Sequence, residues 1–151
     1  MGVTLDAPVP RRRLIQDLTM HICATVKNSN ARHDVSVATS GSVKTLAVPA
    51  REGGFGSSVN GGEFLMLALA TCYCNDLYRE AARLGINIES VEVEASADFE
   101  GRGLGATNIR YRTHVKSTGS AAEIATLLRE TDAVAEVHNT LRAGCAVTRM
   151  E

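Results

Sequence analysis

The sequence predicts an α+β fold that combines antiparallel strands with one long central helix. Stretches of alternating apolar and polar residues lie before and after a single long apolar segment, so the elements follow the order strands, helix, strands, helices, strand. The chain has 151 residues, of which 44% are hydrophobic. That is the size of one ordinary domain with a sizeable core, and we expect a single domain over residues 1–151.

Composition excludes several classes of function. A net charge of -1 argues against a protein that coats nucleic acid or an anionic membrane, because both tasks favour a basic excess. The four cysteines lack the paired spacing of a zinc ribbon or a disulfide framework. No secretory signal pattern is evident at the start. We therefore expect a cytoplasmic protein with free thiols, no metal and no cofactor.

The first third of the chain predicts an antiparallel meander. Apolar and polar residues alternate from Asp17 to Val26, which places Cys23 on the more polar face of a strand. Shorter alternating stretches follow at 35–37 and 43–48, and a glycine-rich loop covers 51–62.

The strongest signal is a helix from Glu63 to Leu84. Its first half, residues 64–74, is apolar nearly all round, and its second half is amphipathic. Asn60 and Glu63 have the spacing of a capping box, and Gly85 fits a helix stop. The apolar part is too short to span a bilayer, so we expect a buried helix that a sheet or a partner subunit covers.

The last third predicts two strands, two helices and a final strand. Alternating residues at 91–99 and 109–116 carry acidic and basic outer faces, which predicts cross-strand charge pairs. Helical spacing follows at 121–131 and around 134–141, with Asp132 as a cap between the two helices. Residues 145–149 are predicted as a closing strand. No histidine has metal-site spacing, and we expect His138 to be solvated or hydrogen-bonded.

Two cysteines in the central helix, Cys72 and Cys74, point in different directions. At about 100° per residue they lie about 200° apart, so they cannot readily share a disulfide or a metal. From spacing alone a buried structural role is favoured for both, because cysteine is among the most buried residue types. A thiol among apolar neighbours has a raised pKa and is unreactive unless a cation reaches it.

Two segments carry a family resemblance. GGEFLMLALATCYCNDLYREAARLGI, from Gly61 to Ile86, resembles the central helix of the OsmC/Ohr family of osmotically inducible and organic hydroperoxide resistance proteins. The second segment, DAVAEVHNTLRAGCAV from Asp132 to Val147, resembles the part of the family that normally carries a second cysteine. The stretches VEVEASADFEG and NIRYRTHVKS fit the family's strand pair. The resemblance implies an intertwined homodimer with the central helices inside wrapped sheets. It also implies thiol-dependent reduction of small organic hydroperoxides, with an external thiol as reductant.

The resemblance assigns site residues and also reveals departures. Cys72 corresponds to the peroxide-attacking cysteine, and Glu63 to an acidic residue near the helix start that positions an activating arginine in the Ohr branch. Glu63 lies nine residues before Cys72, on the opposite side of the helix, so a cap is its alternative role. Ala135 stands where the family has its resolving cysteine. Arg32 is our candidate for the activating arginine.

Several alternatives remain open at this stage. Arg79, on the Cys72 face of the helix, is a weaker candidate for the activating arginine. Cys23 or Cys145 could replace the resolving cysteine only if the fold brings one of them within disulfide reach. The sequence thus supports two functions. The first is a single-cysteine hydroperoxide reductase, and the second is a non-catalytic homodimeric relative that binds a small apolar ligand or serves a stress-related role.

Overall fold

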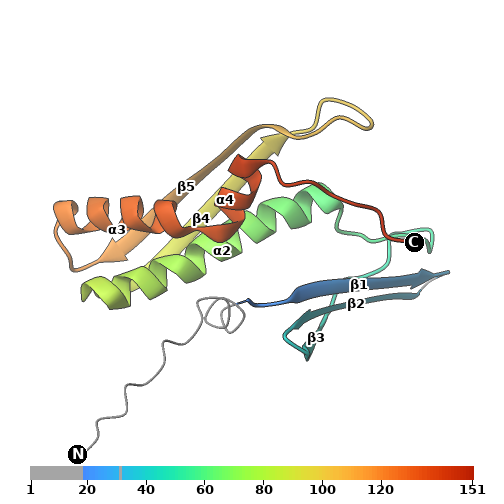
Figure 1. Ribbon diagram of the computed structural model, residues 1–151, viewed down its shortest axis with the longest axis horizontal. Coiled ribbons are helices and arrows are strands. Elements are labelled where there is room, and N and C mark those ends of the chain that lie inside the picture. The colour runs from blue at the N-terminus through green and yellow to red at the C-terminus, as the bar shows by residue number, and fades with distance from the viewer. Residues whose placement is uncertain (1–18, 31) are drawn as a thin grey trace, which may run out of the picture. The chain divides into compact units, whose positions relative to one another are not determined.

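The computed structural model describes residues 19–30 and 32–151, which form two compact units. One unit ends at Val59 and the other comprises Asn60–Glu151. Figure 1 shows the elements of each unit. Within the described residues, every helix is too short or too polar to cross a membrane.

The first unit contains a three-stranded antiparallel sheet. Strands β1 (Ile22–Ser29), β2 (Arg32–Thr39) and β3 (Ser42–Leu46) pair in the order β1-β2-β3. The predicted meander is confirmed, but its first strand begins at Ile22, and Asp17 and Leu18 lie outside the described residues. Residues 32 and 33 begin β2, where they pair with residues 29 and 28 of β1.

The register of this sheet separates an apolar face from a polar one. Val26 pairs with Val35 and Val35 with Leu46, so their side chains share one face. Cys23 lies on the other face, as predicted. Val35 is the one buried hydrophobic residue in the described part of this unit, whereas Val26 remains 60% exposed.

The second unit is organised around helix α2 (Gly61–Leu84). Asn60 and Glu63 form the predicted capping box: each side chain accepts a hydrogen bond from the other residue's backbone N–H, at 2.9 and 2.7 Å. Gly85 ends the helix with a φ of 70°, a left-handed conformation that glycine adopts without a steric penalty. The helix therefore begins and ends where the sequence predicts, within two residues.

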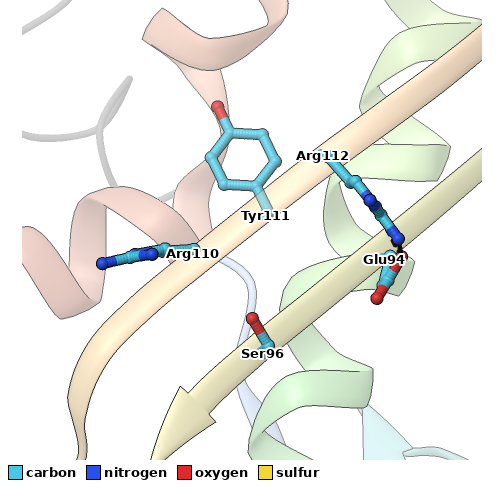
Figure 2. A pocket seen from close by; sticks show the side chains of 5 residues that line it. All are labelled: Glu94, Ser96, Arg110, Tyr111 and Arg112. Carbon is cyan, nitrogen blue, oxygen red and sulfur yellow. Dashed lines mark hydrogen bonds and ion pairs between the residues drawn. The ribbon is translucent and has the colours of Figure 1, made fainter.

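Strands β4 (Ile88–Asp98) and β5 (Thr107–Ser117) form an antiparallel hairpin that packs against α2. Its outer face carries the predicted charge pairs. The Arg112 Nε donates to Glu94 Oε2 at 2.6 Å, as Figure 2 shows, and the Lys116 Nζ lies 2.8 Å from Glu89 Oε2. The alternation places Tyr111 on the opposite, inner face.

Two short helices complete this unit and correct two predictions. Helix α3 (Ala121–Val134) runs alongside α2, and α4 (Glu136–Ala143) follows after a break at Ala135 (Figure 1). Asp132 is not a cap, because α3 continues past it and its carboxylate instead binds Arg142 at 2.8 Å. The predicted strand at 145–149 does not form. No strand of the described chain pairs with it, and Val147 is 98% exposed.

The core of this unit lies where α2, α3 and the inner face of the hairpin meet. Aliphatic and aromatic side chains from all three pack together, with Tyr73, Leu77, Ala81, Leu127 and Ala135 at the centre. The second half of α2 contributes most of this core. The first half is less covered, and Leu67 is 57% exposed.

Candidate functional site

The thiol of Cys72 lies between two carboxylates. Its Sγ donates to Asp76 Oδ2 at 3.4 Å, and Glu136 Oε2 is 3.8 Å away. Asp76 follows Cys72 by one helical turn, so the two share a face of α2. Glu136 is the first residue of α4. It reaches Cys72 because the helical path is interrupted at Ala135, between α3 and α4. One helix and the start of another therefore build the site.

A guanidinium group bridges these two carboxylates. Arg79 Nη1 is 2.9 Å from Asp76 Oδ1 and 3.6 Å from Glu136 Oε1. Asp76 is only 4% exposed, whereas the Arg79 side chain is 52% exposed. Arg79, the weaker of our two arginine candidates, thus lies within the same cluster as Cys72.

Opposing influences act on the Cys72 thiol. Burial raises its pKa, and the neighbouring Asp76 and Glu136 carboxylates raise it further because they repel a thiolate. The backbone N–H of Val137, in the first turn of α4, bonds to the sulfur and opposes this rise in pKa. The net effect is a raised pKa. At neutral pH the resting site therefore holds a protonated thiol.

The buried carboxylate of Asp76 is also perturbed. Burial raises the pKa of Asp76, although its hydrogen bond with Cys72 and the nearby Arg79 charge both act to lower it. A carboxylate with a raised pKa is a better proton acceptor than an ordinary one. The site thus places a thiol proton in contact with a base suited to remove it.

The same cluster has the geometry of a cation site. One donor atom each from Cys72, Asp76 and Glu136 lies within 4.8 Å of the others. Arg79 is already ion-paired with both carboxylates, so it supplies the positive charge that a metal ion would bring. We therefore interpret this group as a thiol site with an arginine counter-ion.

The other predicted site residues lie elsewhere in the described chain. Glu63 contributes its carboxylate to the cap of α2. Arg32 belongs to the first unit, where its Nε binds Asp34 Oδ2 at 2.8 Å. Cys74 adjoins Val93 of β4 in a separate surface hollow, as its 200° offset from Cys72 requires. Within the described residues all four cysteines are free thiols.

The sequence does not predict the surroundings of two residues near the site. Glu136 was not singled out, although it directly follows Ala135, where the resemblance led us to expect a resolving cysteine. His138, expected to be solvated or hydrogen-bonded, is 3% exposed, and neither ring nitrogen has a hydrogen-bond partner in the described residues. The expectation failed because α4 turns His138 inward against Tyr73 and Tyr111, at ring-centroid distances of 5.4 and 4.6 Å.

Comparison with known families decides the classification. The family model described as OsmC-like protein matches residues 54–149, nearly two thirds of the chain. The chain belongs to the OsmC-like family. The match spans the site built by α2 and α4, and it confirms the resemblance seen in the sequence. No curated protein sequence matches the chain significantly.

Solved structures share the OsmC-like fold. An OsmC-like protein from Mycoplasma pneumoniae has 22% identity and a TM-score of 0.59, over 83% of this chain and 89% of that one. An OsmC-like hydroperoxide resistance protein from Jannaschia sp. has 18% identity and a TM-score of 0.51, covering 86% and 89%. An organic hydroperoxide resistance protein OsmC from Legionella pneumophila has 20% identity and a TM-score of 0.53, covering 81% and 89%. At these identities the comparison establishes the α+β fold.

Proposed function

We propose that this OsmC-like protein reduces small organic hydroperoxides with Cys72 as its nucleophile. The observation that carries the proposal is the Cys72 thiol bonded to a buried carboxylate, beside an arginine and the first turn of α4. Two of the similar structures are of hydroperoxide resistance proteins, which supports the same substrate class.

The groups at the site allow a balanced first step. Cys72 gives its proton to Asp76, and the thiolate attacks the terminal oxygen of the hydroperoxide. An S–O bond forms as the O–O bond breaks, so the sulfur is oxidised to a sulfenic acid and the peroxide is reduced. The departing alkoxide takes the proton from Asp76 and leaves as an alcohol. Arg79 stabilises the negative charge that passes between sulfur and oxygen.

Regeneration of the thiol requires an external reductant in this proposal. Ala135 stands where the family resemblance puts a resolving cysteine, and Cys23 and Cys145 are exposed free thiols. Two molecules of a small thiol would reduce the sulfenic acid, giving the Cys72 thiol, a disulfide and water.

The decisive experiment measures turnover of cumene hydroperoxide with a dithiol. We expect Cys72→Ser to abolish turnover and sulfenic acid labelling by dimedone, while the matched variant Cys74→Ser retains both. Unchanged turnover in Cys72→Ser would rule out the proposal. The absence of sulfenic acid at Cys72 after one equivalent of peroxide would favour the non-catalytic alternative below.

The roles of the two carboxylates can be separated by pH. We expect Asp76→Asn and Glu136→Gln each to lower the Cys72 pKa, because each removes a negative charge beside the thiol. The rate of iodoacetamide alkylation against pH measures this shift. Asp76→Asn should nevertheless reduce peroxide turnover, since it removes the proton acceptor, whereas Glu136→Gln should not.

The exposed Glu89 provides the control for the Asp76 and Glu136 variants. Glu89→Gln should change neither the pH dependence of alkylation nor the peroxide turnover. Faster turnover in Asp76→Asn would contradict the role of that carboxylate as proton acceptor.

The comparison of Arg32→Gln with Arg79→Gln in the same peroxide assay decides which arginine activates the thiol. We expect the larger loss from Arg79→Gln, because Arg79 is ion-paired with the carboxylates that contact Cys72.

A second function is favoured by the raised pKa of Cys72, which results from burial and two adjacent carboxylates. A protonated thiol without a resolving partner suits a non-catalytic relative that binds a small apolar ligand. Both functions are proposed for a homodimer, in which a second copy covers the apolar face of the β1–β2–β3 sheet and the exposed first half of α2.

A further inference from the structure

Helix α4 depends on the rest of the second unit for its position. It has eight residues, which is too short for a helix to be stable by itself in water. Its N-cap residue, Ala135, makes no side-chain hydrogen bond to the first turn. The amides of that turn are therefore left for other partners, and the N–H of Val137 bonds to the Cys72 sulfur. The surroundings of Cys72 thus depend on where the first turn of α4 lies.

Side chains of α4 cap the C-terminal end of α3. A helix leaves its last backbone carbonyls without partners, and a following glycine in a left-handed conformation often satisfies them. Here the extended Ala135 follows α3, whose last turn contains no basic residue. Asn139 Nδ2 donates to the Ala133 carbonyl at 3.0 Å, and Arg142 Nη1 donates to the Asp132 carbonyl at 3.3 Å. Because they are three residues apart, Asn139 and Arg142 share one face of α4.

Arg142 is the centre of this connection. Its Nη2 binds Asp132 Oδ1 at 2.8 Å, and its Nη1 lies 3.3 Å from Asn139 Oδ1. The Tyr111 hydroxyl donates to the same Asp132 oxygen, so β5 joins the connection. The positive charge of Arg142 also suits the C-terminal end of α3, where the helix dipole is negative. One guanidinium group therefore links α4 to α3 and, through Asp132, to β5.

We propose that Arg142 is a positioning residue for Cys72, because it holds α4 to the end of α3 and so keeps the first turn of α4 against the sulfur. Arg142 follows Glu136 by six residues, about 9 Å along the helix axis, so it acts through α4 and not on the thiol itself. The inference rests on the proposed function in taking Cys72 as the reactive residue, but its test does not use peroxide turnover.

The test asks whether the effect of Glu136 on the thiol depends on Arg142. In the described chain, the charged groups that face Cys72 are Asp76 and Arg79 of α2 and Glu136 of α4. The Cys72 pKa is measured in the full chain from the pH dependence of iodoacetamide alkylation, followed at this residue by peptide mass spectrometry. We expect Glu136→Gln to lower this pKa when Arg142 is present, because it removes a negative charge beside the thiol.

We expect Arg142→Gln to reduce this effect of Glu136→Gln to about half or less, since α4 no longer holds Glu136 beside the sulfur. Asp76→Asn should lower the Cys72 pKa whether or not Arg142 is present, because Asp76 and Cys72 share helix α2. Loss of the Arg142 charge itself shifts the thiol pKa equally with Glu136 and with Gln at that position, so the two changes would simply add. A reduced Glu136 effect therefore reports a displacement of α4.

The exposed Arg129 of α3 provides the matched control. Arg129→Gln removes the same charge and should leave the Glu136 effect unchanged. Circular dichroism verifies that each variant folds. If Arg142→Gln does not fold, Asn139→Ala takes its place with the same expected result, because it removes the other link from α4 to α3.

Four results would overturn the inference. A wild-type thiol that Glu136→Gln does not affect would mean that α4 does not set its surroundings. An equal Glu136 effect with and without Arg142 would mean that packing of the buried His138 holds α4 alone. The same reduction in Arg129→Gln would assign the effect to charge. Loss of the Asp76 effect as well would indicate general disruption of the site.

The outcome is separable from that of the peroxide proposal. Every measurement follows alkylation of the thiol, so a protein that reduces no hydroperoxide can still show the dependence of the Glu136 effect on Arg142. Conversely, peroxide turnover that requires Cys72 would stand even if that dependence is absent.

Discussion

The two units of the chain bury their hydrophobic residues to different degrees. In residues 60–151, α2, α3 and the β4–β5 hairpin enclose a continuous core in which Leu77 and Leu127 are fully buried. In the described part of residues 1–59, the sheet buries Val35 alone among its hydrophobic residues, and Ile22 and Val26 remain about 60% exposed.

This difference indicates where a partner is needed. Apolar side chains on one sheet face gain stability only when something removes them from water. The second unit provides this cover for half of α2, whereas the first unit leaves its apolar face open. The family resemblance implies an intertwined dimer, and the open face is where we propose that a second copy packs. A single domain over residues 1–151 remains a prediction.

The largest expected effect comes from the closed core. Leu127→Ala should lower the free energy of unfolding by about 2–5 kcal/mol, because it leaves a cavity beside Tyr73 and Leu77. Val43→Ala, on the exposed sheet, should cost less than about 0.5 kcal/mol. Urea unfolding followed by circular dichroism measures both. Equal losses of unfolding free energy in the two variants would mean that the hydrophobic residues of the two units are buried to the same degree.

The second prediction concerns the open face of the sheet. We expect the wild-type protein to have twice the mass of one chain in light scattering. Val26→Asp should shift this mass toward one chain, because it places a charge on the apolar face. Thr25→Asp, its neighbour on the polar face of the same strand, is the matched control. A monomeric wild-type protein at micromolar concentration would refute the dimer.

The smallest effect is expected at the helix caps of the second unit. Asn60→Ala and Ser120→Ala should each lower the free energy of unfolding by about 1 kcal/mol, since each residue caps the first turn of a helix. Thr118→Ala, on the nearby loop, should have no comparable effect. A loss above that of Leu127→Ala would show that the caps, and not the core, determine stability.

The sequence predicts what local patterns encode. The capping box at Asn60, the stop at Gly85 and the alternation of the hairpin strands are short-range signals, and each is confirmed. Helical spacing also places Arg79 on the Cys72 face of α2, and Arg79 binds Asp76, which accepts the hydrogen bond of the thiol.

What the sequence does not predict depends on tertiary contacts. Glu136 lies 64 residues from Cys72 along the chain, and only the packing of α4 on α2 brings the two together. The burial of His138 has the same origin. The incorrect strand at 145–149 shows the converse, because alternation alone cannot provide a strand with a pairing partner.

The ring cluster of Tyr73, Tyr111 and His138 also gives the protein an intrinsic spectroscopic probe. The chain contains no tryptophan and only three tyrosines, of which Tyr78 is 47% exposed whereas Tyr73 is buried. Two of the three tyrosine fluorophores therefore lie in the contact between α2, β5 and α4. Tyrosine emission from the unlabelled protein thus reports mainly on the packing of this one region.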